Sequence, residues 1–131
     1  MDGEVCWTAD TGYIGETSGG KKFEIYSATS PSPMEMVLHA HAACSLIDVK
    51  DGLKHRIDNV DHITIKIESE RATESPKVFT SITMKYIVKG TVPEKLVERL
   101  IESSHKKYCS VGNMITRSGT SLKWSLEMQT D

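Results

Sequence analysis

The sequence predicts an α+β fold of antiparallel sheet packed against two long helices, in the order βββ-α-ββ-α-β. Two observations lead to this fold class. Three short strand-like pieces lie between turn-forming clusters near the N-terminus, and apolar and polar residues alternate along three later segments, which is the period of strands that have one buried face. Two longer segments, one before and one after the central pair of strands, have the periodicity and boundary residues of helices. At 131 residues the chain has the length of a single domain, residues 1–131.

The N-terminal half predicts a small meander followed by a helix. Three short strands are expected at residues 3–9, 13–17 and 21–27, because turn-forming clusters at 10–12 and 18–20 separate them. The helix is expected to run from Pro33 to about Arg56, with Ser32 as its N-cap. Its middle, Val37–Val49, is nearly apolar all round, which is typical of a helix covered on most sides. A monomer of this size does not easily provide that much cover, so we expect a homodimer.

The C-terminal half predicts two long strands, a second helix and a last strand. The strands are expected at His62–Glu70 and Val78–Val88, where alternate residues are apolar. The second helix is expected from about Pro93 to Arg117, and the last strand at Ser121–Met128. On this prediction Cys109 lies within the second helix.

Composition excludes several classes of function. The formal net charge of −2 offers no field to attract phosphate backbones, so a nucleic-acid partner is not expected. No apolar run approaches the roughly 18 residues that span a bilayer. The N-terminus is acidic and polar, unlike a signal peptide, and three cysteines are too few for a disulfide scaffold. We therefore expect a cytoplasmic protein that has no membrane partner.

Two cysteines are the strongest candidates for chemistry. Cys44 and Cys109 lie on different predicted helices, and a fold that joins them would create a dithiol that can be oxidised and reduced. His41 shares a helix face with Cys44, and His105 is the corresponding neighbour of Cys109. The alternative is that both cysteines are ordinary small hydrophobic residues of the core. No metal site or cofactor is expected, because no second ligand cluster accompanies the histidines near Cys44.

The segments SPSPMEMVLHAHAACSLIDV and KYCSV, together with the order of elements, resemble the OsmC/Ohr superfamily and in particular its YhfA-like branch. The resemblance covers essentially the whole chain. It implies a thiol peroxidase built as an intertwined homodimer, with active sites at the subunit interface. It assigns to Cys44 the attack on a hydroperoxide and to Cys109 the resolution as a Cys44–Cys109 disulfide, which an external dithiol reduces.

The resemblance also implies partners that activate the first cysteine. Active peroxidases of the family have a glutamate directly after the helix-opening proline, paired with an arginine from an N-terminal loop. In this chain Met34 occupies the glutamate position and Glu35 follows it. No arginine precedes Arg56, and the basic residues near the expected loop are Lys21 and Lys22. The candidates for activation or for the substrate pocket are therefore Glu35, His41, Lys21, Lys22, His105 and Met34.

A second function stays open at this stage. The chain could be a non-catalytic dimer of the same fold that binds a small apolar ligand at its interface. The absence of the family's glutamate–arginine pair favours this alternative, and oxidation of Cys44 and Cys109 by mild peroxide would distinguish the two.

Overall fold

The computed structural model describes residues 1–130 of the chain. Its residues form two compact units, Met1–His39 and the chain from Ala40 onward. The helices and strands confirm the predicted α+β class and the order of elements, with differences at three places.

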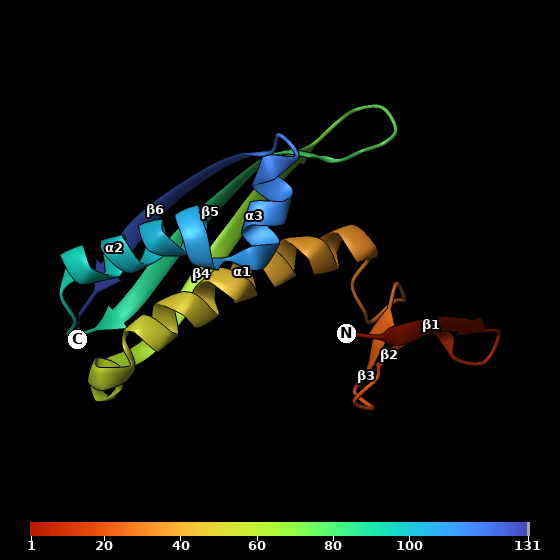
Figure 1. The fold of residues 1–131 in the computed structure, drawn as a ribbon, viewed down its shortest axis with the longest axis horizontal. Coiled ribbons are helices and arrows are strands. Elements are labelled where there is room, and N and C mark those ends of the chain that lie inside the picture. Colours follow the sequence, from red (N-terminus) through yellow and green to blue (C-terminus); the bar gives the residue numbers. More distant parts are fainter. Residues whose placement is uncertain (131) are drawn as a thin grey trace. The chain divides into compact units, whose positions relative to one another are not determined.

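The first unit contains a three-stranded antiparallel meander (Figure 1). Its strands are β1 (Gly3–Thr8), β2 (Gly12–Thr17) and β3 (Lys22–Ile25). Cys6 pairs with Ile14 in the centre of the β1–β2 ladder, and its side chain is exposed. The three predicted strands are thus present, with β3 shorter than its alternating pattern suggested.

Helix α1 (Pro33–Gly52) begins in the first unit with a capping box. The backbone N–H of Glu35 donates to Ser32 Oγ at 3.2 Å, and the N–H of Ser32 donates to Glu35 Oε1 at 3.1 Å. Each residue satisfies one N–H that the first helical turn leaves without a partner. These bonds to Ser32 hold the pKa of the Glu35 carboxyl below its ordinary value.

The same helix ends earlier than the sequence pattern indicated. It stops at Gly52 instead of continuing to Arg56, and a 3₁₀ helix, η1 (Lys54–Asn59), follows. Leu53 makes the junction: it is fully buried, and its N–H lies within hydrogen-bonding distance of the carbonyls of Val49 and Lys50. Glycine is a poor helix former, so the chain tightens at this point and leaves Leu53 in the core.

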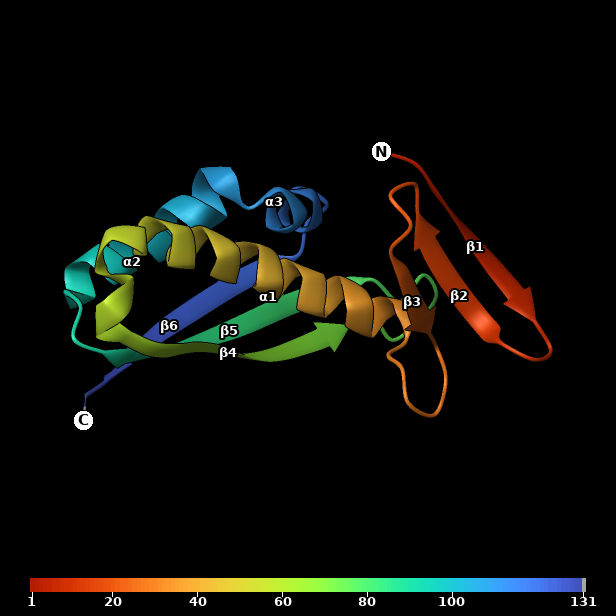
Figure 2. The same ribbon diagram turned by 90° about the horizontal axis from the view of Figure 1, so that it is seen from below.

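Three strands form the sheet of the second unit, in the order β4-β5-β6 (Figure 2). They are β4 (Val60–Arg71), β5 (Phe79–Gly90) and β6 (Ser121–Gln129). β4 and β5 pair antiparallel, as expected, with Ile65 opposite Tyr86. β6 pairs parallel to β5, which the antiparallel pattern of the sequence did not indicate. The reason is the connection, because helices carry the chain from the end of β5 back to the level of its start.

The helix predicted at Pro93–Arg117 is interrupted. It comprises α2 (Glu94–Ser103), a π-helical turn η2 (Ser104–Tyr108) and α3 (Ser110–Arg117). Cys109 separates the last two with an extended backbone, φ −75° and ψ 96°, and therefore lies at a helix start and not within a helix. The thiol of Cys109 stands in for the usual hydroxyl or carboxylate N-cap, because its Sγ accepts the N–H of Gly112 at 3.3 Å.

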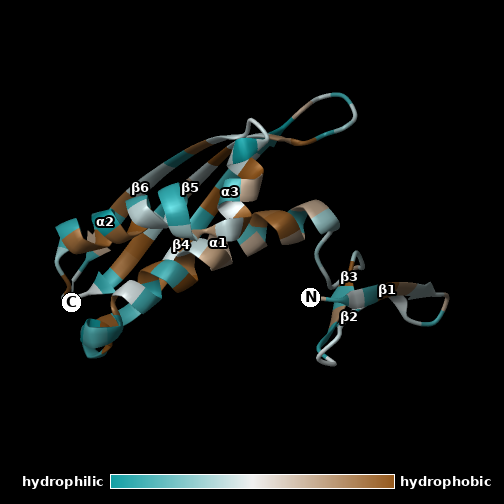
Figure 3. Cartoon of the chain, in the orientation of Figure 1, coloured by the Kyte–Doolittle hydropathy of each residue, from teal (hydrophilic) through white to brown (hydrophobic). Residues whose placement is uncertain are grey.

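In the second unit the helices cover one face of the β4–β6 sheet (Figures 1 and 2). Hydrophilic and hydrophobic residues alternate along α2, as expected for a helix with one buried face (Figure 3). The inward side chains of β5 are fully or almost fully buried, whereas Thr83 and Lys85 on its other face are exposed. The side chains of this core include Val49, Leu53, Ile82, Met84, Tyr86, Val88, Val97 and Ile101.

Candidate dithiol site

The second unit brings Cys44 and Cys109 into contact. Cys44 is on α1 and half-buried, and Cys109 is buried at the start of α3. Both are free thiols, and the neighbouring Cys44 raises the pKa of Cys109. The two sulfurs that the sequence could only suggest as partners are therefore neighbours in the fold.

The environment of Cys109 keeps its thiol protonated. Burial raises the pKa of Cys109 to about 12, while the Gly112 N–H that points at the sulfur acts in the opposite direction. The neighbouring Cys44 thiol raises this pKa further. Cys109 Sγ lies 3.8 Å from the carbonyl oxygen of His41, an acceptor for its proton. Cys44 is therefore the sulfur that a solute can reach, and Cys109 is the protonated thiol behind it.

His41 lies next to this pair and has no polar partner. Its side chain is fully buried, and neither ring nitrogen makes a hydrogen bond. Burial holds its pKa below the ordinary value, so the imidazole is neutral at pH 7.

Gly112 shows how closely the ring of His41 approaches Cys109. A Cβ at this glycine would lie 2.5 Å from His41 Nε2 and 3.0 Å from Cys109 Sγ. Both atoms thus border the space that the missing side chain leaves on α3. The absence of a side chain at this position lets the imidazole sit beside the thiol.

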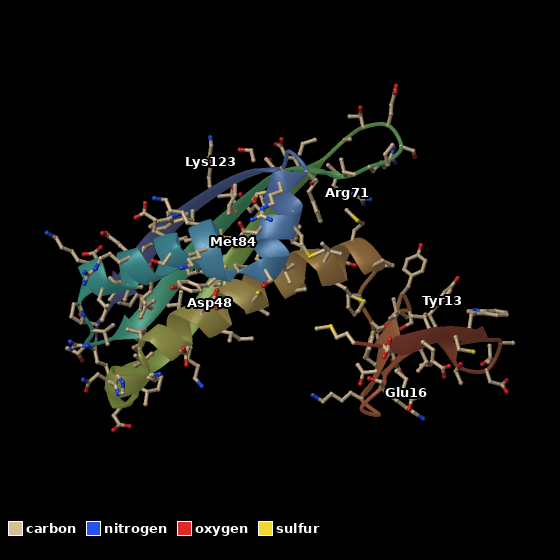
Figure 4. All side chains as sticks on the ribbon, viewed as in Figure 1. Tyr13, Glu16, Asp48, Arg71, Met84 and Lys123 are labelled. Carbon is tan, nitrogen blue, oxygen red and sulfur yellow. The ribbon has the colours of Figure 1, made fainter. Side chains whose placement is uncertain are left out.

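A chain of polar side chains continues from the histidines across the core. Tyr86 Oη lies 2.7 Å from His105 Nε2 and 2.5 Å from Ser45 Oγ. Ser104 Oγ lies 3.0 Å from Ser45 Oγ and 2.8 Å from Asp48 Oδ2. Asp48, which Figure 4 labels on α1, is the last residue of this polar network. Three elements, α1, β5 and η2, are thus tied together by buried polar contacts.

His41 and His105 face each other at the opposite end of this polar network. Their rings meet edge to face with centroids 6.0 Å apart. Burial, and to a smaller extent the neighbouring His41, lowers the pKa of His105 to about 4. Burial also raises the pKa of Tyr86, so its hydroxyl stays protonated. Both histidines and the tyrosine are therefore uncharged at neutral pH, which is the state that a buried site favours.

Within residues 1–130, no three histidine, cysteine, aspartate or glutamate side chains are grouped as ligands of a metal ion. In the same part of the chain, none of the helices has both the length and the apolar character needed to cross a bilayer.

Comparisons with known proteins identify the family of this chain. The family model described as OsmC-like protein matches residues 26–125. Protein YhfA of Escherichia coli K12 is 35% identical over 122 residues, which cover 90% of this chain and 91% of that protein. The chain belongs to the OsmC family.

Solved structures of other proteins have the same fold as this chain. A protein from Aquifex aeolicus VF5 superposes with a TM-score of 0.87 at 32% identity, over 99% of this chain and 96% of that one. An organic hydroperoxide resistance protein OsmC from Legionella pneumophila superposes with a TM-score of 0.68 at 15% identity, over 97% of each chain. The resemblance to the OsmC/Ohr superfamily and to its YhfA-like branch is thereby confirmed.

The candidate residues of this OsmC-family chain fall into two groups. Cys44, Cys109, His41 and His105 lie together in the second unit. Lys21, Lys22, Met34 and Glu35 belong to the first unit. Lys21 and Lys22 are exposed, Lys21 just before β3 and Lys22 as its first residue, and the Glu35 carboxylate accepts a hydrogen bond at the start of α1. A role for these four residues in activation stays a prediction.

Sequence reasoning missed Ser45, Ser104 and Tyr86 as parts of the site, because each occurs in a pattern that reads as ordinary core. One feature of the sequence could have identified Ser45. His41, Ser45 and Val49 follow each other at four-residue intervals on the buried face of α1, so two polar groups occupy an apolar helix face. Buried polar side chains need hydrogen-bond partners, and this need predicts a network on the facing elements.

The first unit contains an apolar pocket of its own. Its volume is about 570 Å³, and its walls come from the meander and the first turns of α1. The lining residues are Val5, Tyr13, Ile25, Tyr26, Pro33, Met36 and Val37. Several of these side chains are exposed, which is unusual for so many large apolar groups in a unit of this size.

Proposed function

We propose that this chain is a cysteine-based thiol peroxidase that reduces hydroperoxides through Cys44 and Cys109. The observation that carries the proposal is the neighbouring pair of free thiols, one half-buried and one fully buried. A catalytic dithiol needs an accessible sulfur that meets the peroxide and a second sulfur in place to form the disulfide. Membership of the OsmC family supports the same chemistry, since a relative of this fold is named as a hydroperoxide resistance protein.

In the first step the thiolate of Cys44 attacks the terminal oxygen of the hydroperoxide. An S–O bond forms, the O–O bond breaks, and the departing alkoxide takes up a proton and leaves as an alcohol. Cys44 is oxidised to a sulfenic acid, and the peroxide is reduced by two electrons.

In the second step the sulfur of Cys109 attacks the sulfur of the Cys44 sulfenic acid. The S–S bond forms, the S–O bond breaks, and the hydroxide leaves as water with the proton from Cys109. An external dithiol then restores both thiols by exchange and is itself oxidised to a disulfide. A reducing cytoplasm would keep that dithiol available.

The proposed working form is an intertwined homodimer. The exposed apolar side chains of the first unit and the 65% exposure of Ile47 on α1 support it, because a second chain would remove this surface from water. Only the face of α1 that carries His41, Ala42, Ser45 and Val49 is buried within one chain.

Peroxide consumption with dithiothreitol as reductant tests the peroxidase directly. We expect turnover by the wild type and none by Cys44→Ser. Without reductant, Cys109→Ser should be oxidised once and form no intramolecular disulfide. In Cys109→Ser the sulfenic acid should be trapped by dimedone on Cys44. Cys6→Ser is the matched control, because Cys6 is exposed on β1, and it should retain full activity. Equal peroxide consumption by all four proteins would remove the proposal.

The apolar pocket of the first unit favours the second candidate, a dimer that binds a small apolar ligand without catalysis. Mass spectrometry after mild peroxide treatment separates the two functions. A loss of about two hydrogens per chain, mapped to Cys44 and Cys109, supports the peroxidase. An unchanged mass at both residues, with saturable binding of an apolar fluorescent probe that Val37→Glu abolishes, supports the binding protein.

A further inference from the structure

When the Cys44–Cys109 disulfide forms, the thiol proton of Cys109 must leave the sulfur. Cys109 is not in contact with bulk water. The thiol of this residue is fully buried. Its pKa of about 12 means that almost none of it is ionised at neutral pH. Formation of the disulfide breaks the S–H bond of Cys109, and its proton passes to the departing hydroxide, either directly or through a nearby base.

We propose that His41 accepts the proton of Cys109 as the disulfide forms and passes it to the departing hydroxide. This inference rests on the proposed peroxidase function. It concerns the resolving step alone and leaves the attack of Cys44 on peroxide unassigned. In the balanced step, the S–H bond of Cys109 and the S–O bond of Cys44 break, the S–S bond forms, and water leaves. His41 returns to its starting state and is neither oxidised nor reduced.

The geometry places an unused base beside the thiol. His41 Nε2 and Cys109 Sγ both border the empty Cβ position of Gly112, at 2.5 Å and 3.0 Å from it. Both ring nitrogens of His41 are buried and without a hydrogen-bond partner, an arrangement that native cores rarely tolerate without a reason. A neutral imidazole has one nitrogen free to accept a proton, and its low pKa keeps it neutral when the step occurs.

The groups that face His41 fit this role. His105, from η2, meets its ring edge to face and is neutral because its own pKa is about 4. Tyr86, from β5, is bonded to His105 Nε2 and keeps its proton. Cys44, on the same helix as His41, is a free thiol that neighbours Cys109. Asp48 lies at the far end of the network of polar side chains and accepts a hydrogen bond from Ser104. Among the residues of this network, Asp48 carries the negative charge that would favour a transient imidazolium at His41.

Rapid mixing of the reduced protein with cumene hydroperoxide tests the proposal. Dimedone trapping measures the sulfenic acid on Cys44, and mass spectrometry without reductant measures the disulfide. In His41→Gln the dimedone signal measures the first step by itself, so the rate of disulfide formation is taken relative to the sulfenic acid that has already formed. Disulfide formation should be at least about 100-fold slower at pH 7, the usual contribution of a positioned base. Its rate should also rise about tenfold per pH unit from pH 7 to pH 9, because free hydroxide replaces the imidazole.

The matched control is His55→Gln, an exposed histidine of η1 in the same unit, which should resolve at the wild-type rate. If His41→Gln does not fold, the wild-type pH profile still decides. It should be flat from pH 7 to pH 9 and fall below the pKa of His41. A tenfold rise per pH unit in the wild type, or wild-type resolution in a folded His41→Gln, would overturn the role of His41. Absence of sulfenic acid in the wild type would instead overturn the peroxidase function and this inference with it.

Discussion

Tyr86 occupies the centre of the polar chain in the core of the second unit. Its hydroxyl contacts Ser45 at 2.5 Å and His105 at 2.7 Å, and its ring packs against Trp124 with centroids 6.3 Å apart. The phenol therefore does two things: its ring fills the core, and its oxygen satisfies two buried groups that have little access to water.

We predict that Tyr86→Phe destabilises the protein by about 1–3 kcal/mol. The ring remains, so no cavity forms, but Ser45 and His105 Nε2 each lose a partner inside the core. Urea denaturation followed by circular dichroism measures the change. Tyr108→Phe is the matched control, because Tyr108 is exposed and the same substitution there should have almost no effect. Equal stability of the two variants would show that the buried hydroxyl contributes nothing.

At the scale of the element, the interruption of the second helix builds the site. Had the helix continued through residue 109, the sulfur of Cys109 could not cap α3 or receive the N–H of Gly112. The π-helical turn Ser104–Tyr108 adds the needed change of direction, and such turns often occur at functional sites. Cys109, His105 and Ser104 thus reach the same region from one short segment.

Gly112→Ala offers a test in which two effects have opposite signs. Alanine is the better helix former by about 1 kcal/mol, so propensity alone predicts a gain in stability. The added Cβ would, however, lie 2.5 Å from His41 Nε2 and 3.0 Å from Cys109 Sγ. We predict that the clash dominates and that the variant loses about 1–3 kcal/mol, measured by thermal unfolding.

The matched control is Gly19→Ala in the turn after β2. A Cβ at Gly19 would meet only Thr17 Oγ1, at 3.8 Å, so the substitution should be nearly neutral. A Gly112→Ala protein more stable than the wild type would contradict the close approach of His41 to Cys109.

The sequence predicted most elements of the fold and part of the site. The features that it predicted depend on local patterns, and those that it missed depend on tertiary contacts. Strands such as Phe79–Gly90 have a strong period of two, which local pattern detects. The break at Cys109 has no proline, and the nearest glycine lies three residues later. It depends on tertiary contacts of the cysteine with Cys44 and Gly112, which a local pattern does not contain. The parallel pairing of β6 is likewise a property of the crossover and not of the strand itself.

The sequence identified Cys44, Cys109, His41 and His105 as candidates, and these four meet in the structure. The serines and the tyrosine could not be found in the same way, because their role depends on which element faces them. Ser45 and Ser104 are distant in the sequence yet only 3.0 Å apart between their hydroxyl oxygens.

At the scale of the whole molecule, we predict that the protein is a dimer in solution. Light scattering coupled to size exclusion should give twice the mass of one chain. Ile47→Glu should shift the equilibrium toward the monomer, because a charge would replace an apolar side chain that is 65% exposed in the single chain. A wild-type mass of one chain, constant over a hundredfold range of concentration, would contradict the proposed assembly.

The stability of the molecule should fall on mild acidification because of its buried histidines. The pKa of His105 is lowered from about 6.5 to about 4, and that of His41 is lowered in the same direction. Below pH 6.5 the unfolded chain binds protons that the folded protein does not, so the free energy of unfolding decreases as pH falls toward 4. Above pH 6.5 both states are neutral at these residues and this contribution to stability is complete.

Urea denaturation at several values between pH 7.5 and pH 4.5 measures this effect. We expect a loss of about 2 kcal/mol for His105 after allowance for the partial exposure of its ring. His105→Gln should show a smaller loss over the same window, because glutamine does not titrate and its amide can still bond Tyr86. His55→Gln should follow the wild type. Glu35 and Glu127, whose pKa values are lowered from 4.5, affect stability only as pH falls further, so the window above 4.5 isolates the histidines. A stability that is constant from pH 7.5 to pH 4.5 would mean that His105 and His41 reach protons freely, contrary to their burial in the polar core.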